Sequence, residues 1–214
     1  MQNVIIYLIG YFGIGKYSIA KSLSELENVK VIDNHYIINP VYALMEDKGA
    51  VSDQALAQVW SEVLQVRQAI LSVIQNFTSR AHNYVFTDDL ANDEGSYQDY
   101  KAILEVANTR KAIFVPVILR CELEEYLRRV SNQNRSERMK DTNVVQAKIH
   151  HQANQLFSSR HLNELILDIT DLEPMQAAVL IMQHIENLSP NDQCPSGGTD
   201  SSAPQKVVNQ IAKD

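Results

Sequence analysis

A glycine-rich segment near the start of the chain limits what this protein can fold into. It reads GYFGIGKYS, at residues 10–18, and directly follows a continuous apolar run at residues 4–9. Such a run predicts a strand that is buried on both faces. A strand, a glycine-rich turn and a helix in this order are typical of a phosphate-binding loop. The helix is expected because apolar residues recur at helical spacing, at Ile19, Ala20, Leu23 and Leu26.

The spacing within this segment is that of the Walker A motif, Gly-x-x-x-x-Gly-Lys, with Gly10, Gly15 and Lys16 at the defining positions. The glycines of such a loop let backbone N–H groups point at phosphate oxygens, and the lysine reaches the β- and γ-phosphates. The following helix adds the positive end of its dipole. The residues expected to contact a nucleotide are Gly10, Gly13, Ile14, Gly15, Lys16, Tyr17 and Ser18.

Tyr17 departs from the motif, because the position after the lysine usually holds a serine or threonine whose hydroxyl binds Mg²⁺. A tyrosine hydroxyl lies at the far end of a ring and cannot replace a short side-chain oxygen beside the backbone. Ser18 supplies the nearest hydroxyl, and Asp88 follows a later apolar strand. Since Mg²⁺ keeps several waters and needs one or two protein ligands, we expect Ser18 and Asp88 to hold it, with the acid acting directly or through water and Asp89 as the alternative acid. The loop is modified rather than disabled.

Strands and helices alternate along the rest of the chain, which predicts a three-layer αβα sandwich around a five-stranded parallel sheet. Residues 36–51 are expected to be mainly loop. Pro116, inside the fourth strand, favours an edge position or a bulge for that strand. The expected strands cover residues 4–9, 29–32, 84–87, 112–119 and 165–169, and the later helices cover a segment from Ser52 or Asp53, then residues 96–110, 122–130, 144–157 and 174–188.

Composition divides the chain into one domain and a tail. Residues 1–188 are expected to form the domain, while residues 189–214 are low in apolar residues and rich in turn formers, which predicts disorder. The net charge of −7 argues against binding to nucleic acid or to an anionic membrane. Two cysteines far apart and an apolar run too short to span a bilayer favour a cytoplasmic protein.

Polar residues end the expected strands, at the edge where parallel sheets bind their ligands. Asp33 ends the second strand, and a carboxylate across a cleft from a γ-phosphate can orient and deprotonate an attacking hydroxyl. The alternative is that Asp33 only caps a turn with Asn34. Asp88 has the same alternative, capping the next element. Arg67 lies mid-helix among apolar residues and glutamines, and a surface position is favoured over one that reaches a substrate pocket.

Three segments together resemble the P-loop small-molecule kinases, the group of nucleoside-monophosphate-kinase-like proteins, shikimate kinase, gluconate kinase and chloramphenicol phosphotransferase. They are GYFGIGKYSIAKSL, then VIDNH, and an arginine-bearing segment after the fourth strand. The resemblance covers about residues 3–188 and implies the P-loop kinase type of fold.

The resemblance also implies an activity, which is transfer of the γ-phosphoryl group of ATP, with Mg²⁺, to a hydroxyl or phosphate of a small molecule. It implies a catalytic role for Asp33 beside Lys16. It further implies a lid at about residues 131–143, whose neighbourhood supplies the arginines that stabilise the transferring charge. Those arginines are Arg129, Arg135 and Arg138.

Two other functions stay open at this point. A nucleotide-binding regulatory protein or NTPase without transfer to a small molecule would also tolerate Tyr17. A NAD(P)-binding dinucleotide fold is the second, because Asp33 lies at the distance from the loop where a ribose-binding acid is expected, although the glycines are spaced G-x-x-G-x-G rather than G-x-G-x-x-G. The small-molecule acceptor is not identified by any motif, and a monomer and a homodimer are both compatible with the sequence.

Overall fold

Parallel strands form one central sheet in this computed structural model, which describes residues 1–45, 52–131, 143–153 and 157–188. The strand order across the described sheet is β2-β3-β1-β4-β5, and all neighbours pair in parallel. The strands are β1 (Val4–Ile9), β2 (Val29–Asp33), β3 (Asn83–Asp88), β4 (Ile113–Arg120) and β5 (Leu165–Asp168). The helices are α1 (Lys16–Leu26), α2 (Asn34–Tyr42), α3 (Asp53–Phe77), α4 (Glu94–Arg110), α5 (Leu123–Val130), α6 (Val144–Ala153) and α7 (Pro174–Glu186).

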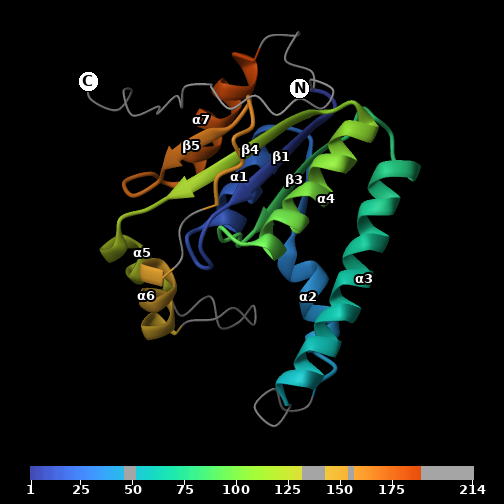
Figure 1. Cartoon of the computed structure of the whole chain (residues 1–214). Helices are drawn as coiled ribbons and strands as arrows, with labels where there is room; N and C mark the ends of the chain where they lie inside the picture. Colours follow the sequence, from blue (N-terminus) through green and yellow to red (C-terminus); the bar gives the residue numbers. More distant parts are fainter. Residues whose placement is uncertain (46–51, 132–142, 154–156, 189–214) are drawn as a thin grey trace.

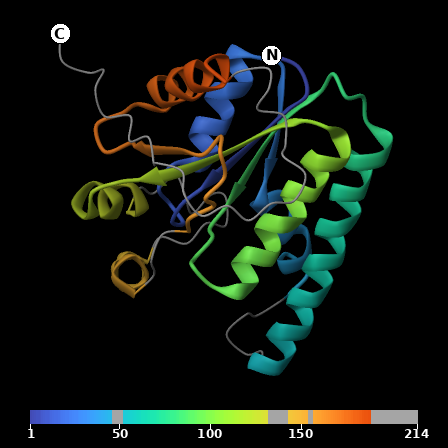
Figure 2. The same cartoon turned by 45° about the horizontal axis from the view of Figure 1, so that its top comes forward.

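Helices cover both faces of the sheet, which confirms the expected three-layer αβα architecture (Figures 1 and 2). Alternate residues of β1 point to opposite faces. Val4, Ile6 and Leu8 pack with apolar residues of α1 and α7. Ile5, Tyr7 and Ile9 pack with those of α3 and α4. This double burial is why the β1 sequence is apolar at every position.

The strand order distinguishes between two nucleotide-binding folds. In a dinucleotide-binding Rossmann sheet, the second strand of the chain lies beside the first. Here β3 lies between β1 and β2. Asp33, at the end of β2, is therefore two strands away from the glycine-rich loop, rather than next to it. This order contradicts the dinucleotide alternative.

The segment after β2 is a helix, α2, where the sequence analysis expected mainly loop. Asp33 is its N-cap, and its side chain accepts a hydrogen bond from the backbone N–H of His35 at 3.3 Å. Pro40 lies inside α2, which ends two residues later at Tyr42. A capping acid offsets the low helix propensity of a segment that carries a proline near its end. Residues 46–51 lie outside the described part of the chain.

The expectation that Pro116 marks an edge or a bulge is wrong. β4 lies between β1 and β5, and Pro116 pairs in register with Tyr7 of β1. β5 is short, and its register with β4 begins only at Val117. The N–H that proline lacks is therefore not needed at this point of the sheet. Beside it, the Asn163 side chain donates to the carbonyl of Phe114 at 3.0 Å.

Arg110 is the last residue of α4 and is 1% exposed, and its side chain contacts the end of α3. Its guanidinium donates to the carbonyl of Ile74, to the Thr78 hydroxyl at 2.7 Å and to the carbonyl of Ser79 at 2.8 Å. It also lies over the ring of Tyr84. Because the last carbonyls of a helix need partners, this side chain closes the end of α3.

None of the helices in the described ranges is both long and apolar enough to cross a membrane.

Replacing Arg110 with methionine should lower the free energy of unfolding by about 2–4 kcal/mol, because several buried carbonyls lose their donor. Chemical denaturation measures the change. Arg80→Met, at an exposed position in the loop before β3, is the matched control and should unfold almost as the wild type does. Equal stability of the two variants would show that Arg110 does not close the helix end.

Candidate active site

The glycine-rich loop joins β1 to α1, and its backbone conformation requires glycine at two positions. Gly13 and Gly15 have φ angles of 82° and 120°, which only glycine adopts without strain. At Gly10 a Cβ atom would lie 3.1 Å from the carbonyl oxygen of Leu119, so the loop passes close to β4. Ile14 is fully buried and anchors the loop from below.

The start of α1 is free of side-chain capping. Gly15 is the N-cap and carries no side chain, and the first turn holds no acidic residue. Backbone N–H groups at such a terminus, together with the helix dipole, favour an anion. Lys16 donates from Nζ to the backbone carbonyls of Gly10 and, at 2.8 Å, of Tyr11. The lysine is thus folded back onto the loop itself.

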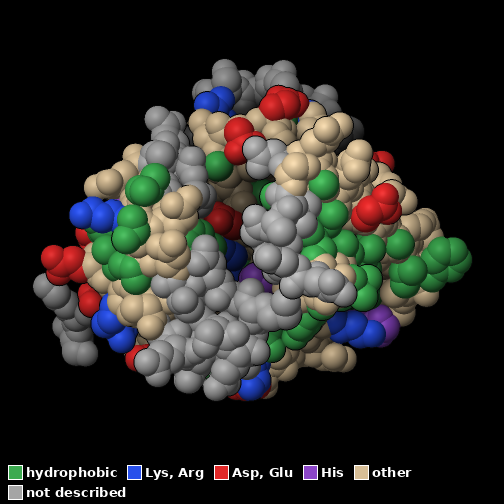
Figure 3. All heavy atoms as spheres, turned by 90° about the horizontal axis from the view of Figure 1, so that it is seen from below, with side chains coloured by type: hydrophobic (Ala, Val, Ile, Leu, Met, Phe, Trp, Pro, Cys, Tyr) green, Lys and Arg blue, Asp and Glu red, His purple; other side chains and the backbone are tan. Residues whose placement is uncertain are grey.

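A cleft of about 1020 Å³ opens beside the loop, at the carboxyl ends of the strands. Its volume lies at the upper end of the range of small-ligand sites, roughly 300–1,000 Å³. Seen from below, the surface is hollowed near its centre, and acidic, basic and histidine side chains show within the hollow (Figure 3). The lining includes the glycine-rich loop with Lys16–Ser18, residues 33–35 after β2, residues 87–89 after β3, Glu125, Arg128 and Arg129 of α5, and residues 170–174.

Asp33 lines this cleft and is held from two sides. Thr87 Oγ1 donates to Asp33 Oδ1 at 2.8 Å, and the N–H of His35 donates to the same oxygen at 3.3 Å. Asp33 and Thr87 are register partners on β2 and β3. The capping role that the sequence analysis left open is therefore present. A role in proton transfer is compatible with it and stays a prediction.

Asp88 also lines the cleft, but its carboxylate forms a buried ion pair. Arg67 of α3 pairs with Oδ2 and donates to Oδ1 at 3.4 Å, and the Tyr7 hydroxyl donates to Oδ2 at 2.7 Å. Arg67 and Asp88 are only 6% and 5% exposed. Burial alone would lower the pKa of Arg67, but the charge of Asp88 raises it above its ordinary value, so the guanidinium stays charged.

The surface position expected for Arg67 is therefore wrong. The residue lies on the same face of α3 as Val63 and Leu71, which are buried against the rest of the fold. A helical spacing of four residues places all three on one face. The buried guanidinium is tolerated there because two acids balance its charge. Asp88, the last residue of β3, pairs with it, and Asp99 lies 3.9 Å from its Nε.

The expected magnesium ligands do not fit together as direct ligands. Both carboxylate oxygens of Asp88 already contact the guanidinium of Arg67. Tyr17 turns toward α2, where its hydroxyl lies 3.2 Å from that of Tyr36 and the two rings meet edge to face. Ser18 is exposed at the start of α1. Asp89, the alternative acid, is exposed and lines the cleft.

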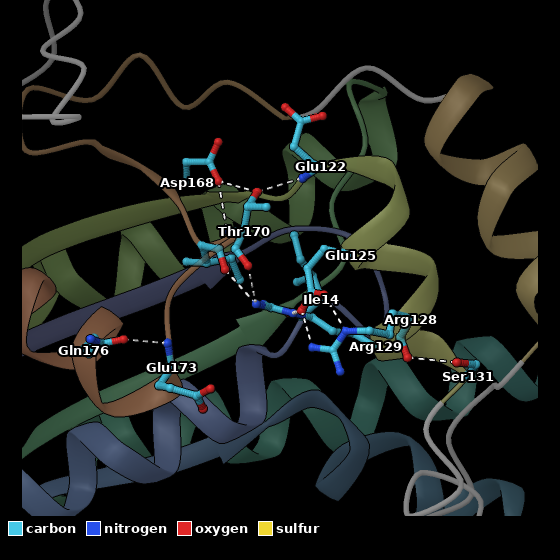
Figure 4. Close-up of polar contacts among 11 residues, drawn as sticks. Ile14, Glu122, Glu125, Arg128, Arg129, Ser131, Asp168, Thr170, Glu173 and Gln176 are labelled. Atoms are coloured by element: carbon cyan, nitrogen blue, oxygen red, sulfur yellow. Dashed lines mark hydrogen bonds and ion pairs between the residues drawn. The ribbon is translucent and has the colours of Figure 1, made fainter. Parts of the chain in front are cut away.

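Arg129 ties three parts of the site together (Figure 4). Its guanidinium donates to the carbonyl of Ile14 in the loop at 3.0 Å and to the carbonyl of Ile169 after β5 at 2.7 Å. Nε donates to Glu125 at 2.7 Å. Hydrogen bonds from Arg128 and Arg129 lower the pKa of Glu125 to about 2, so this acid stays ionised at neutral pH.

The structure thus brings Lys16, Ser18, Asp33, Asp88 and Arg129 to one cleft. The other two arginines expected over the phosphates, Arg135 and Arg138, lie outside the described residues, as do the expected lid and tail apart from the ends of the lid.

The sequence analysis missed Thr87, Tyr36 and Glu125. Glu125 carries a signal, since it lies three and four residues before two arginines on a helix. Tyr36 and Thr87 carry none, because their partners become neighbours only once the strand order and α2 are known.

No family model matches the sequence, and no curated protein matches it. Solved structures do match in fold. A candidate kinase from Chloroflexus aurantiacus has a TM-score of 0.60 at 12% identity, covering 88% of this chain and 100% of that one. A gluconokinase from Sinorhizobium meliloti 1021 has a TM-score of 0.58 at 12% identity, with 88% and 95% covered. The tunicamycin resistance protein of Deinococcus radiodurans has a TM-score of 0.52 at 16% identity, with 87% and 96% covered.

At these identities the likeness concerns the fold alone. The kinases among these structures match the chain over nearly their whole length. Their fold is the one that the glycine-rich loop and the alternation of strands and helices predict.

Replacing Lys16 with alanine should abolish stabilisation by ATP, because the lysine is the one flexible cation that the loop itself carries. ATP at 100 times its Kd should stabilise the wild type by about 2.7 kcal/mol. Thermal unfolding with and without ATP measures the difference. Lys30→Ala, at an exposed position of β2, should keep the full shift. An unchanged shift in Lys16→Ala would remove the loop from nucleotide binding.

Replacing Arg129 with methionine should lower the free energy of unfolding by about 2–3 kcal/mol, because two loops lose their shared donor. Arg128→Met is the control. Its side chain is 75% exposed and pairs with Glu125 on its own helix, so little change is expected. If Arg129→Met unfolds like Arg128→Met, the tie contributes nothing to stability.

Proposed function

We propose that this chain, which has the fold of the P-loop small-molecule kinases, transfers the γ-phosphoryl group of ATP to a hydroxyl or phosphate of a small molecule. One observation carries the proposal. The glycine-rich loop with Lys16 and the carboxylate of Asp33, which caps α2, line the same cleft, although they follow different strands. A phosphate-binding end and a candidate base are the two parts that phosphoryl transfer needs in one place.

The donor end of the cleft is proposed to lie along α1 and α5. Loop N–H groups and the start of α1 would bind the phosphates, and Lys16 would leave the carbonyls of Gly10 and Tyr11 for them. Arg128 and residues 170–174 line the cleft beyond the loop. The remainder of the nucleotide is proposed to lie there. These residues would hold ATP in position before the reaction. Such positioning, with electrostatic stabilisation, supplies most of the rate enhancement in phosphoryl transfer.

Asp33 is the proposed base. It would accept the proton of the acceptor hydroxyl while that oxygen attacks the γ-phosphorus, and the bond from the γ-phosphorus to the β–γ bridging oxygen breaks to release ADP. Thr87 and the N–H of His35 hold one carboxylate oxygen and so fix its direction. A phosphate acceptor would use Asp33 for orientation instead.

The remaining residues have supporting roles in this proposal. Arg129, together with Arg135 and Arg138 of the expected lid, would neutralise charge on the transferring group. Arg129 would do so from the tie that it forms between the loop and β5. Residues 1–188 are proposed as the catalytic domain, in the cytoplasm, with residues 189–214 as a tail outside it.

A second candidate function is nucleotide binding without transfer to a small molecule. The ion pair at Asp88 favours it, because the acid that usually serves the metal in such sites is neutralised here. ATP binding without any turnover in a panel of sugars, sugar acids and nucleosides would support this second function over the first.

Replacing Asp33 with asparagine should lower kcat by about 10²–10⁴-fold if the carboxylate is the base, because asparagine cannot accept the proton. ATP affinity should stay near the wild-type value, since Asp33 is not part of the glycine-rich loop. Steady-state kinetics with an acceptor found in the panel, together with ATP titration, separates the two effects. Unchanged turnover in Asp33→Asn would refute the assignment.

A further inference from the structure

The position after the loop lysine supplies no short hydroxyl in this chain. Tyr17 occupies it, and its hydroxyl lies 3.2 Å from that of Tyr36 on α2. The two ring centroids are 6.4 Å apart with the planes at 84°. The side chain therefore connects the first turn of α1 to the first turn of α2. It does not place an oxygen next to the loop, where a P-loop threonine or serine would contact Mg²⁺.

The strand-end acid is also engaged, and by groups from two other elements. Arg67 comes from α3 and Tyr7 from β1, and both contact the Asp88 carboxylate. Tyr7 is fully buried, as Arg67 and Asp88 nearly are. The pair as a whole is electrically neutral, so it offers little attraction to a divalent cation. Pulling Asp88 toward a metal would leave Arg67 as an uncompensated buried charge, which is strongly unfavourable.

The other two acids at the strand ends, Asp33 and Asp89, do not replace this pair. Asp33 Oδ1 accepts hydrogen bonds from Thr87 and from the N–H of His35. Asp89 is exposed beside Asp88, and single exposed carboxylates bind Mg²⁺ chiefly through its waters. In the described ranges, no three His, Cys, Asp or Glu side chains gather around a common point that could hold a metal.

From these two engaged positions we infer that the chain binds its nucleotide without giving magnesium a direct protein ligand. Arg67 and Tyr17 are the residues that determine this behaviour. Any magnesium arrives on the nucleotide and is separated from the protein by water. The inference rests on the proposed nucleotide site, and its consequence is an affinity for ATP or ADP that hardly depends on magnesium.

Isothermal titration of the full chain with ADP, once in excess MgCl₂ and once in EDTA, tests the inference. We expect the two Kd values to agree within about threefold, which is less than 1 kcal/mol. A more than tenfold tighter Kd in magnesium would overturn the inference while leaving the nucleotide site intact. Absence of ADP binding in both conditions would overturn the proposed function and this inference with it.

Two variants at Tyr17 with side chains of similar size test whether the missing hydroxyl causes the independence from magnesium. Tyr17→Thr and Tyr17→Val differ by one hydroxyl, so a comparison between them measures what a restored ligand contributes. In the wild-type background both should remain almost independent of magnesium, because Arg67 still holds Asp88. Combined with Arg67→Gln, the threonine variant should bind ADP about tenfold more tightly in magnesium than in EDTA, and the valine variant should not.

The variants keep the inference testable if the ion pair is needed for folding. Circular dichroism of each double variant identifies a folding failure, and the wild-type comparison in MgCl₂ and EDTA still decides the question. Binding of Mn²⁺ to the protein–ADP complex, followed by electron paramagnetic resonance, gives a direct second readout. An Mn²⁺ signal with direct protein ligands in the wild type would overturn the inference.

Discussion

Parallel pairing of β1 between β3 and β4 is the constraint on which the rest of the structure depends. It brings the carboxyl ends of the strands to one edge, so that the glycine-rich loop, Asp33 and Asp88 reach one cleft from distant parts of the chain. The loop packs against its neighbours directly, since the N–H of Gly10 donates to the carbonyl of Asp88 at 3.3 Å. The site is thus an extension of the sheet, and its geometry follows from strand order.

Much of this arrangement could be predicted from the sequence. The glycine spacing and the apolar runs identified the loop, all the strands of the described sheet and the layered fold, because strand burial and loop geometry each require particular residue types. Strand order could not be predicted in this way, and neither could the contacts that depend on it. Thr87 supports Asp33 only because β2 lies beside β3. Pro116 was predicted to be an edge residue because nothing near it in the sequence shows that β5 pairs with β4 only from Val117 onward.

Arg67 shows a different limit of sequence reasoning. An arginine among apolar neighbours is compatible with a surface position, a ligand site and a buried pair, and only the position of Asp88 decides between them. A buried ion pair contributes little to stability compared with apolar packing, but breaking it is costly. Asp88 lines the cleft while it is paired with Arg67, and Tyr17 occupies the position after the loop lysine, so the chain departs from the usual motif at both positions that would serve Mg²⁺.

Equilibrium dialysis of radiolabelled ATP against the full chain tests the central claim most directly, with unlabelled GTP, NAD⁺ and NADP⁺ as competitors in separate cells. The claim is that the glycine-rich loop forms a working triphosphate site despite Tyr17. The account predicts one bound ATP per chain that the dinucleotides do not displace. Absence of bound ATP, or its displacement by NAD⁺ or NADP⁺ at equal concentration, would contradict the account.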